Sequence, residues 1–440
     1  MRFLIAGLLL FASASQVCAA TYNVGKGAQF RSLSDVPWAK LVPGDEIIVG
    51  GGVNDSAVEI TSHGTAERPI IVRAAPGTHP VNTRPIIFEG ATYVIVDGFT
   101  VHDTMFPGFM IRHGAEGITI RNSTAYDTGE GVWIADGAAM NHRILNNVFR
   151  NNKTFGVGAD RVSNVPGKET IIAGNTITGN KVHGIEIIGN YYIIEHNIVS
   201  ANGWDAKGSS GIHLFARDAK ANTGNHNVIR YNVSYNNKDD GGEDGNGIQL
   251  DQWCDDNQVY FNVAFGNEGA GISVYDSSGN TIYNNTLVGN MTHAKNHSYR
   301  TEFLLSGDKK VGHTSGNTIR NNIIEATRND DVAIFVGAPA AAHPQDIGNN
   351  ILYNRAAGNV FDFAGKLGRG ASEWNALKKG MPDIFADPAF HNTNRAVDGG
   401  LVPRAGSPAA GKGVAVDNAS VDAAGSKIDR LPIGAYMPMP

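Results

Sequence analysis

The 440-residue sequence has few cysteines, few charged residues and no excess of basic ones. It contains 2 cysteines and 18% charged residues, and 36 Lys and Arg stand against 42 Asp and Glu, a formal net charge of −6. A nucleic-acid-binding protein needs a basic surface, so this composition argues against nucleic acid as a partner. No apolar run reaches the roughly 20 residues of a membrane-spanning helix, so we expect no membrane span.

The longest apolar run lies at the start of the sequence. Arg2 precedes the apolar segment 3–11, and small residues near position 20 offer a cleavage site, so residues 1–20 are predicted to be a cleaved secretory signal. The protein is therefore expected to be secreted or periplasmic. Cys18 would leave with the signal, and Cys254 alone cannot form an internal disulfide.

Long segments of helical periodicity are also missing, and an internal repeat of short β-prone segments takes their place. A first file of asparagines precedes these segments: Asn122, Asn147, Asn175, Asn197, Asn232, Asn262, Asn285, Asn322 and Asn350. A second polar file follows each of the earlier positions: Asp127, Asn152, Asn180, Asn202, Asn237, Asn267 and Asn290. Asparagine tolerates left-handed turns, and its amide can bond the same amide one coil away, so stacked coils explain both files.

The second file is followed by a glycine and an alternating strand, as in Gly184–Ile187 and Gly211–Leu214. This pattern predicts an all-β fold, a single-stranded parallel β-helix of about ten coils over residues 70–360. Residues 21–69 are expected to form an N-terminal cap with the first strands. Residues 361–440, rich in Ala, Gly and Pro, are expected to pack along the cylinder or to close its far end.

A strand has period two, so the third residue of each Gly-Ile-x-Leu segment should point away from the core. These residues form an outward file: Trp133, Gly158, Glu186, His213, Gln249 and Ser273. A second outward file lies two residues on: Ala135, Asp160, Ile188, Phe215, Asp251 and Tyr275. Because neighbours in a file are one coil apart, Glu186, His213 and Gln249 should lie together, with Asp251 diagonal to His213.

Two insertions lengthen the coils around this point, at residues 204–207 and 238–244. The second is acidic and could supply hard oxygen ligands for Ca²⁺. The candidate ligands are Asp218, Asp239, Asp240, Glu243 and Asp244. The alternative is a solvated, glycine-rich turn. No organic cofactor is expected.

The asparagine files and Gly-Ile-x-Leu strands resemble those of the right-handed parallel β-helix proteins, which include pectate, alginate and chondroitinase-type lyases. The segments Gly44–Val49, Gly64–Val72, Asp387–Phe390 and Ile433–Tyr436 are similar too. The resemblance implies a right-handed coil and polysaccharide processing. The sequence lacks the Asp-Pro-His-Asp of mannuronan epimerases and the Asn-Thr-Asp-Gly of polygalacturonases, and Asn246–Gln249 is a poor match to the Asn-Gly-x-Glu of chondroitinase-like alginate lyases. The subfamily stays open.

The leading interpretation is a monomeric lyase that cleaves an anionic, uronate-containing polysaccharide by β-elimination. The reaction needs a group that neutralises the carboxylate, a base for the C5 proton and an acid for the leaving oxygen. Arg217, Lys207 or Ca²⁺ would neutralise the carboxylate. His213 or Lys181 would be the base, and Tyr275 or His183 the acid. The predicted substrate-binding residues are Glu186, Trp204, Lys207, Phe215, Gln249 and Asp251.

Three alternatives remain open at this point. An inverting glycoside hydrolase would use Glu186 and Asp251, two outward carboxylates roughly 10 Å apart, as its pair. A non-catalytic carbohydrate-binding protein would need aromatic side chains and no essential acid or base. An epimerase is the third.

Overall fold

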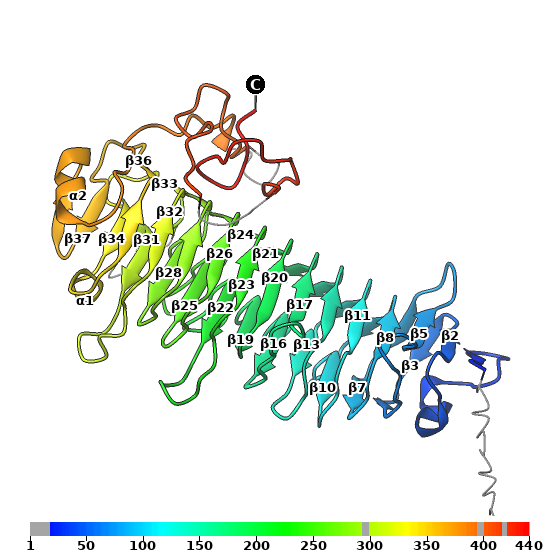
Figure 1. The fold of residues 1–440 in the computed structure, drawn as a ribbon. Coiled ribbons are helices and arrows are strands. Elements are labelled where there is room, and N and C mark those ends of the chain that lie inside the picture. Colours follow the sequence, from blue (N-terminus) through cyan, green and yellow to red (C-terminus); the bar gives the residue numbers. More distant parts are fainter. Residues whose placement is uncertain (1–17, 293–298, 394–399, 416–419, 440) are drawn as a thin grey trace, which may run out of the picture.

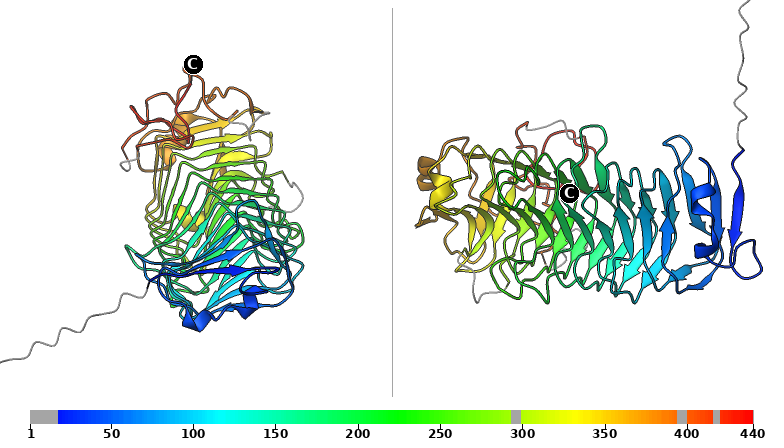
Figure 2. Two further views of the ribbon diagram at one scale, coloured as in Figure 1. Left: turned by 90° about the vertical axis from the view of Figure 1, so that its right-hand side faces the viewer. Right: turned by 90° about the horizontal axis from the view of Figure 1, so that it is seen from below.

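The computed structural model describes residues 18–292, 299–393, 400–415 and 420–439. Most of the predicted signal segment lies outside these residues, so its removal and the export of the protein stay predictions. The chain winds into a long three-sided parallel β-solenoid, seen from the side in Figure 1 and along its axis in Figure 2. No helix within the described ranges is long and apolar enough to cross a membrane.

Each coil contributes one strand to each of three sheets, here named A, B and C. Sheet A contains β1 (Thr21–Val24), β2 (Glu46–Val49), β5 (Ile70–Ala74), β8 (Val94–Asp97), β11 (Thr119–Arg121), β14 (Arg143–Leu145), β17 (Thr170–Ala173), β20 (Tyr192–Glu195), β23 (Val228–Arg230), β26 (Gln258–Tyr260), β29 (Thr281–Tyr283), β32 (Thr318–Arg320) and β35 (Asp346–Gly348). Sheet B contains β3 (Gly52–Asn54), β6 (Pro80–Asn82), β9 (Thr100–His102), β12 (Thr124–Tyr126), β15 (Val148–Arg150), β18 (Thr176–Thr178), β21 (Ile198–Ser200), β24 (Val233–Tyr235), β27 (Val263–Phe265), β30 (Thr286–Val288), β33 (Ile323–Ala326) and β36 (Ile351–Asn354). Sheet C contains β4 (Val58–Ile60), β7 (Ile86–Glu89), β10 (Phe109–Arg112), β13 (Val132–Ile134), β16 (Val157–Asp160), β19 (Ile185–Ile188), β22 (Ile212–Phe215), β25 (Ile248–Asp251), β28 (Ile272–Tyr275), β31 (Thr301–Ser306), β34 (Val332–Val336), β37 (Phe361–Phe363) and β38 (Lys366–Gly368).

The solenoid is longer than the predicted ten coils, since its sheets contain 13, 12 and 13 strands. The difference arises partly at the N-terminus, where β1 to β4 already lie in the three sheets. Two 3₁₀ turns, η1 (Leu33–Asp35) and η2 (Trp38–Lys40), lie between β1 and β2. The helices are short: α1 (Ala338–Ala341) and α2 (Ala371–Leu377).

Inward-pointing aliphatic side chains fill the cylinder. On β19 and β22 the inward residues Ile185, Ile187, Ile212 and Leu214 have 0% exposure, and each stacks on its counterpart one coil away. Burial of such a side chain contributes about 1.5–3 kcal/mol. Repetition of this contact along the axis stabilises a chain that has no disulfide among its described residues.

Both asparagine ladders are present in the solenoid, each directed along the axis. The Asn147 backbone N–H and Nδ2 both donate to Asn175 Oδ1, at 2.9 and 3.0 Å, and the same pair of bonds recurs from coil to coil. The first member of each file was predicted one residue too early. Ser123 and Thr128 occupy the ladder positions, because Asn122 and Asp127 take the preceding left-handed turn positions, with φ of 52° and 54°.

The ladders end on carboxylates. Asp383 Oδ1 accepts from the backbone N–H and the Nδ2 of Asn350, at 2.7 and 2.9 Å, and its Oδ2 accepts from Trp374 Nε1. Glu302 Oε2 accepts the corresponding pair from Asn290, at 3.0 and 2.7 Å. Glu302 Oε1 is buried and has no partner, and burial raises the pKa of Glu302 to about 8.

We expect Glu302 to make the stability of the fold dependent on pH. Its pKa is raised from 4.5 to about 8, so the stability that its protonated form provides is complete below about 4.5 and is lost as pH rises towards 8. The free energy of unfolding should fall by up to about 1.4 kcal/mol per pH unit in that window. Glu302→Gln keeps an acceptor for Asn290 and cannot ionise, so it should stabilise the protein at pH 9 and change little at pH 5.

Urea unfolding at both pH values measures this difference. Glu59→Gln, at a side chain that is 59% exposed, is the matched control and should change neither value. Equal effects of Glu302→Gln at pH 5 and pH 9 would show that Glu302 does not titrate in this range.

The C-terminal segment packs against the solenoid after closing its end. Trp374 of α2 is fully buried, with its ring 5.1 Å from that of Phe361. The chain then lies along the outer face of sheet B (Figure 1), where Ile433 and Tyr436 share an apolar cluster with Ile323. This segment covers the C-terminal part of sheet B, from β27 to β36, and the side chains of sheet C that form the predicted outward files lie outside this cluster.

Candidate functional site

The outward file on sheet C has the predicted register. Glu186 of β19 pairs with His213 of β22, and His213 pairs with Gln249 of β25. The second file is present too, since Asp251 pairs with Phe215 on one side and with Tyr275 on the other. Period two and stacked coils are therefore sufficient to bring these side chains together from distant parts of the sequence.

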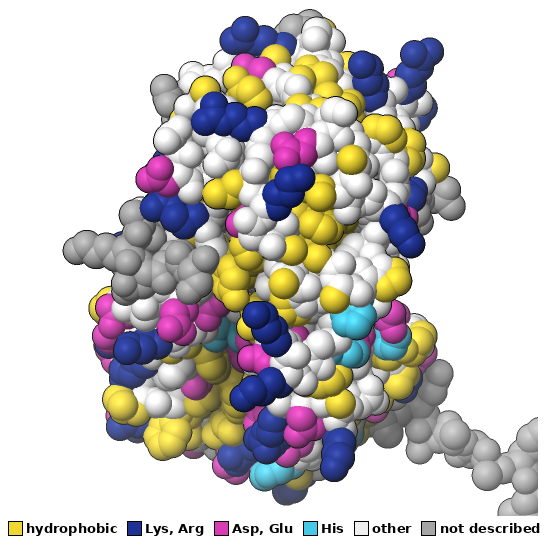
Figure 3. All heavy atoms as spheres, turned by 90° about the vertical axis from the view of Figure 1, so that its left-hand side faces the viewer, with side chains coloured by type: hydrophobic (Ala, Val, Ile, Leu, Met, Phe, Trp, Pro, Cys, Tyr) yellow, Lys and Arg dark blue, Asp and Glu magenta, His cyan; other side chains and the backbone are white. Residues whose placement is uncertain are grey.

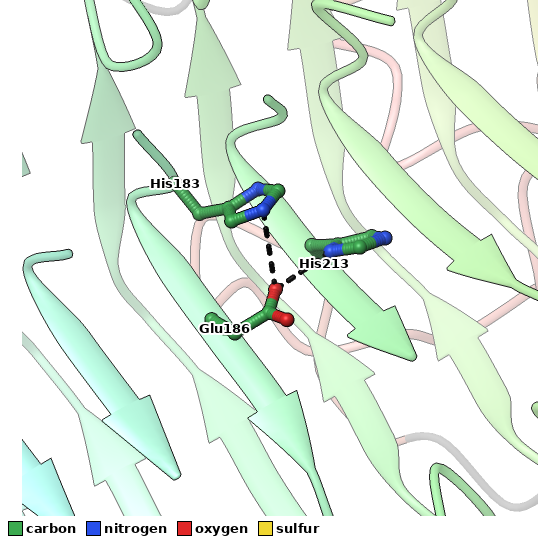
Figure 4. Close-up of side chains that lie close together, drawn as sticks. All are labelled: His183, Glu186 and His213. Carbon is green, nitrogen blue, oxygen red and sulfur yellow. Dashed lines mark hydrogen bonds and ion pairs between the residues drawn. The ribbon is translucent and has the colours of Figure 1, made fainter. Parts of the chain in front are cut away.

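A charged cluster lies at the centre of this face (Figure 4). Glu186 Oε2 is 2.6 Å from His213 Nδ1 and 3.4 Å from His183 Nε2, and the two imidazole rings stack with centroids 4.4 Å apart. All three side chains are at least nine-tenths buried. The other ring nitrogen of His213, Nε2, lies 3.5 Å from Asp251 Oδ2.

The environment of His183 fixes its tautomer. The Ser210 backbone N–H donates to His183 Nδ1 at 3.0 Å, so Nδ1 carries the lone pair and Nε2 carries the proton. Burial lowers the pKa of His183 to about 4, which keeps the ring neutral. His183 Nε2–H therefore points at Glu186, and His183 supports that carboxylate.

His213 has the opposite character. Burial lowers its pKa, but the Glu186 and Asp251 carboxylates raise it more, and the net result is a pKa well above the usual histidine value. His213 is therefore an imidazolium at neutral pH, held between two carboxylates. Glu186 has a lowered pKa because the two histidines outweigh the effect of its burial. An imidazolium has no free lone pair, so the structure does not support His213 as the base.

A groove of about 370 Å³ opens beside the cluster, of a size typical for small-ligand sites. Its lining includes Asp244, Asn246, Gln249, Asp251, Ser273, Tyr275 and Tyr299. Asp251 belongs both to the groove and to the contact with His213, so it connects the buried charges to the open surface. Burial raises the pKa of Tyr275, which keeps its hydroxyl protonated.

Asp244 is a further carboxyl group of the groove. Its Oδ1 accepts from Gln249 Nε2 at 2.8 Å and from Asn246 Nδ2 at 3.2 Å. Burial raises its pKa to about 6. Since Oδ1 is engaged by two amides, Oδ2 is the oxygen that can carry a proton. The groove is thus lined by Asp244, which protonates near neutral pH, by Asp251, which lies beside His213, and by the exposed Glu243.

Several predicted site residues lie elsewhere. Lys181 forms an ion pair with Asp205 at 2.7 Å and lies 5.0 Å from the Trp204 ring, so it is not a free base. Trp204 and Lys207 are exposed on the insertion loop. Phe215, Arg217 and Asp218 line a separate hollow of about 460 Å³, and that hollow does not include His213.

The acidic loop does not present its carboxylates as a set. Asp239 is buried, and its oxygens accept from the backbone N–H groups of Ser209, Glu243 and Asp244. Asp240 and Glu243 are exposed, and Asp218 accepts from backbone N–H groups on its own turn. These contacts leave the five predicted ligands dispersed and give no support to a calcium site formed by them.

Within the described ranges, His183, Glu186 and His213 form the one group of three potential ligands whose ligand atoms all lie within 4.8 Å of one another. Metal binding through His183 Nε2 would need a proton on Nδ1. Nδ1 faces an N–H donor, so the tautomer is wrong for a metal ligand. The cluster is therefore suited to holding charge and protons.

Sequence reasoning missed Ser210, Asn246 and Tyr299. Ser210 lies three residues before His213, Asn246 lies three residues before Gln249, and both contact Gln249 Oε1. A search of the position three residues before each outward residue could therefore have found them. Tyr299 comes from the insertion between β30 and β31, and no repeat position predicts it.

The surface seen in Figure 3 carries Lys and Arg side chains dispersed among acidic and neutral ones. No continuous basic area covers this view, in agreement with the net charge of −6.

Comparison with known protein families identifies the type of fold. The model of the right-handed beta helix region matches residues 78–166 and 156–309, more than half of the chain. No curated protein matches the sequence.

Solved structures share the fold at low identity. One is the complex of XylC with xylose, 12% identical over 94% of this chain and 98% of that one, with a TM-score of 0.57. Another is the PL6 family polysaccharide lyase Pedsa3628 from Pseudopedobacter saltans, 13% identical over 94% and 99%, with a TM-score of 0.53. A third is the PL6 family alginate lyase AlyGC, 16% identical, with a TM-score of 0.53; the match covers 94% of this chain and 58% of that one.

Proposed function

The chain belongs to the right-handed β-helix family, and on this scaffold we propose that the groove beside His213 cleaves a uronate-containing polysaccharide by β-elimination. The observation that carries the proposal is the contact between Asp251, which lines the groove, and the buried His213. Two of the structures that share the fold are polysaccharide lyases, which supports the same reaction class.

Asp251 is the proposed base. Its Oδ2 lies 3.5 Å from His213 Nε2, and its side chain lines the groove. It takes the proton from C5 of the uronate, the electron pair forms the C4=C5 double bond, and the C4–O bond breaks. Asp251 thus takes the role that the sequence suggested for His213, which acts instead as the fixed positive charge.

Tyr275 is the proposed acid, as predicted from the sequence. It lies one coil from Asp251 in the same outward file and keeps its proton because burial raises its pKa. It gives that proton to the leaving oxygen as the bond breaks, so base and acid approach the sugar from adjacent coils.

Asp244 is proposed to bind the uronate carboxylate. The described residues that line the groove include no Lys or Arg that could neutralise the uronate carboxylate. A hydrogen bond must therefore stabilise that carboxylate. Protonated Asp244 can donate from Oδ2, since Gln249 and Asn246 already hold Oδ1. Carboxylic acids donate strongly to carboxylates, and the bond reduces the charge that opposes loss of the C5 proton.

We expect the affinity for an anionic substrate to decrease above pH 6. Asp244 loses its proton as pH rises through about 6, and its negative charge then opposes the uronate. KM should increase by up to about tenfold per pH unit above that value. In Asp244→Asn the amide cannot ionise, so its KM should stay flat over the same range; a KM of the native protein that is independent of pH from 5 to 8 contradicts this role.

An inverting glycoside hydrolase is the second candidate, favoured by one observation. Asp244, whose pKa is raised by burial, and Asp251, which lies beside His213, are two carboxyl groups in one groove, and an inverting hydrolase needs such a pair as general acid and general base. The pair predicted from the sequence does not fit, because Glu186 is buried against His213.

Incubation with alginate, pectate, glucuronan and xylan separates the two reactions. Elimination produces an unsaturated sugar that absorbs in the ultraviolet together with new reducing ends, and hydrolysis produces reducing ends without absorbance. Asp251→Asn, assayed in parallel, identifies activity that comes from contaminants. Binding with neither signal would leave a carbohydrate-binding protein and refute both catalytic proposals.

A further inference from the structure

Sheet C carries a second feature, three coils before His213. Trp133 of β13 lies in the same outward file as Glu186 and His213, separated from Glu186 by Gly158 of β16. At about 4.8 Å per coil, Trp133 is roughly 14 Å from His213 along the axis. Any polymer that follows sheet C through the groove therefore passes over Trp133.

Gly158 provides the place in which the indole lies. A Cβ on Gly158 would be 2.6 Å from Cζ3 of Trp133 and 2.9 Å from Cδ2 of Phe155, closer than side chains tolerate. The backbone of Gly158 is outside the left-handed region, so the turn does not require glycine there. What requires it is the ring of Trp133, which lies across the strand with Phe155 beside it.

The two rings continue into the catalytic cluster. Trp133 and Phe155 stack with centroids 6.0 Å apart, Phe155 and His183 with centroids 5.7 Å apart, and His183 then stacks on His213. The rings are tilted by 20° to 28° from one to the next, so they form a continuous row along the solenoid. Trp133 and Phe155 remain partly exposed, unlike His183 and His213.

Exposed apolar side chains border the row. Met105 and Phe106 are 74% and 64% exposed, and their loop is bonded to the coil of Trp133 through Gly129 N–H and Phe106 O at 2.9 Å. Exposed apolar side chains that gather at one place on a surface are typical of a contact site.

From these contacts we propose that Trp133, Phe155 and Gly158 form an aromatic platform on which a pyranose ring of the polysaccharide stacks. Aromatic rings present a large apolar face that matches the apolar face of a sugar. The platform deepens the proposed function and rests on it: it gives the enzyme a remote subsite, so that chains long enough to reach from Trp133 to Asp251 bind better than short ones.

The test measures binding in the Asp251→Asn background, where the polymer is not consumed. Trp133→Ala should weaken the affinity for the polymer that the native protein cleaves by about tenfold, and Trp133→Phe should recover part of it. Gly158→Ala keeps both rings but displaces the indole, so it should weaken binding as well. Tyr126→Ala is the matched control, since Tyr126 is a partly exposed aromatic residue of the same coil on sheet B, stacked on His102.

Chain length separates a subsite from structural damage. Binding of a di- or trisaccharide should be unchanged in Trp133→Ala, because such fragments cannot span the distance to the platform. Unchanged polymer affinity in Trp133→Ala, or equal loss for short and long chains, overturns the platform while leaving the proposed function intact. Failure of the native protein to bind or cleave any of the polymers overturns the proposed function itself.

Discussion

Asp251→Asn is expected to lower kcat by about 10³-fold while the protein stays folded. The amide has nearly the same shape as the carboxylate but cannot accept the C5 proton, so the reaction loses its base. Folding should be little affected, because the Asp251 side chain is 20% exposed and its contact with His213 is long, at 3.5 Å. Initial rates on the preferred polymer, together with the melting temperature, measure the two effects separately.

Asp160→Asn is the control for this prediction. Asp160 lies in the same outward file on sheet C, but in the separate hollow that contains Phe215. Its substitution should leave kcat within about twofold, because a surface carboxylate without a role contributes little. Full turnover in Asp251→Asn would show that Asp251 is not the base and would return that role to another side chain.

Asn147→Ala is expected to be among the most destabilising single substitutions in this chain. Asn147 Nδ2 donates to Ile120 O and Asn175 Oδ1, at 2.9 and 3.0 Å, and its Oδ1 accepts from the Ser123 N–H at 3.0 Å. All of these groups are buried, and alanine would leave the Ser123 N–H without its partner and remove two further buried hydrogen bonds. At about 1–3 kcal/mol for the unsatisfied group and about 1 kcal/mol for each lost bond, the loss is about 3–5 kcal/mol.

Its neighbour provides the control. Asn146 is exposed and has a φ of 56°, so Asn146→Gly satisfies the same backbone conformation and removes no buried bond. Denaturant unfolding should show a change of less than about 1 kcal/mol for Asn146→Gly. Similar losses in the two variants would mean that the turn, and not the ladder, carries the stability.

The fold was readable from the sequence because one physical rule repeats in every coil. Side chains alternate between the core and the outside along each strand, and those in the core must be apolar. At each turn a side-chain amide must bond the backbone groups that the strands leave without partners. The register of Glu186, His213 and Gln249 follows from that rule alone. The rule does not distinguish a left-handed turn position from the ladder position that follows it, because asparagine suits both, as in Asn146 and Asn147. For this reason Asn122 and Asp127 were wrongly assigned to the ladders.

A third ladder, which links Asn227, Asn257, Asn280 and Asn317, was not predicted. Its members precede strands of sheet A, where insertions of different length obscure the spacing. Irregular loops also explain what was missed in the site. The path of residues 238–247 decides that Asp239 binds backbone N–H groups while Asp244 enters the groove, and no repeat specifies that path.

The protonation states of the site residues could not be predicted from the sequence. Histidine, glutamate and aspartate in one file suggest an acid and a base, but their burial decides which of them holds a proton. The pKa of His213 is raised well above the usual histidine value because the buried ring lies between the carboxylates of Glu186 and Asp251. That information depends on three coils at once, so a residue-by-residue interpretation could not supply it.

The direction of the asparagine ladder bears on how the protein is made. In the first ladder, the backbone N–H and one Nδ2 proton of each asparagine are donated to a side chain that comes later in the sequence, and the last of these acceptors is Asp383. The ladder asparagine of each coil therefore has donors without partners until the next coil has formed. Growth of the solenoid from its N-terminal end would therefore be completed at Asp383, whose carboxylate accepts the last donors of this ladder.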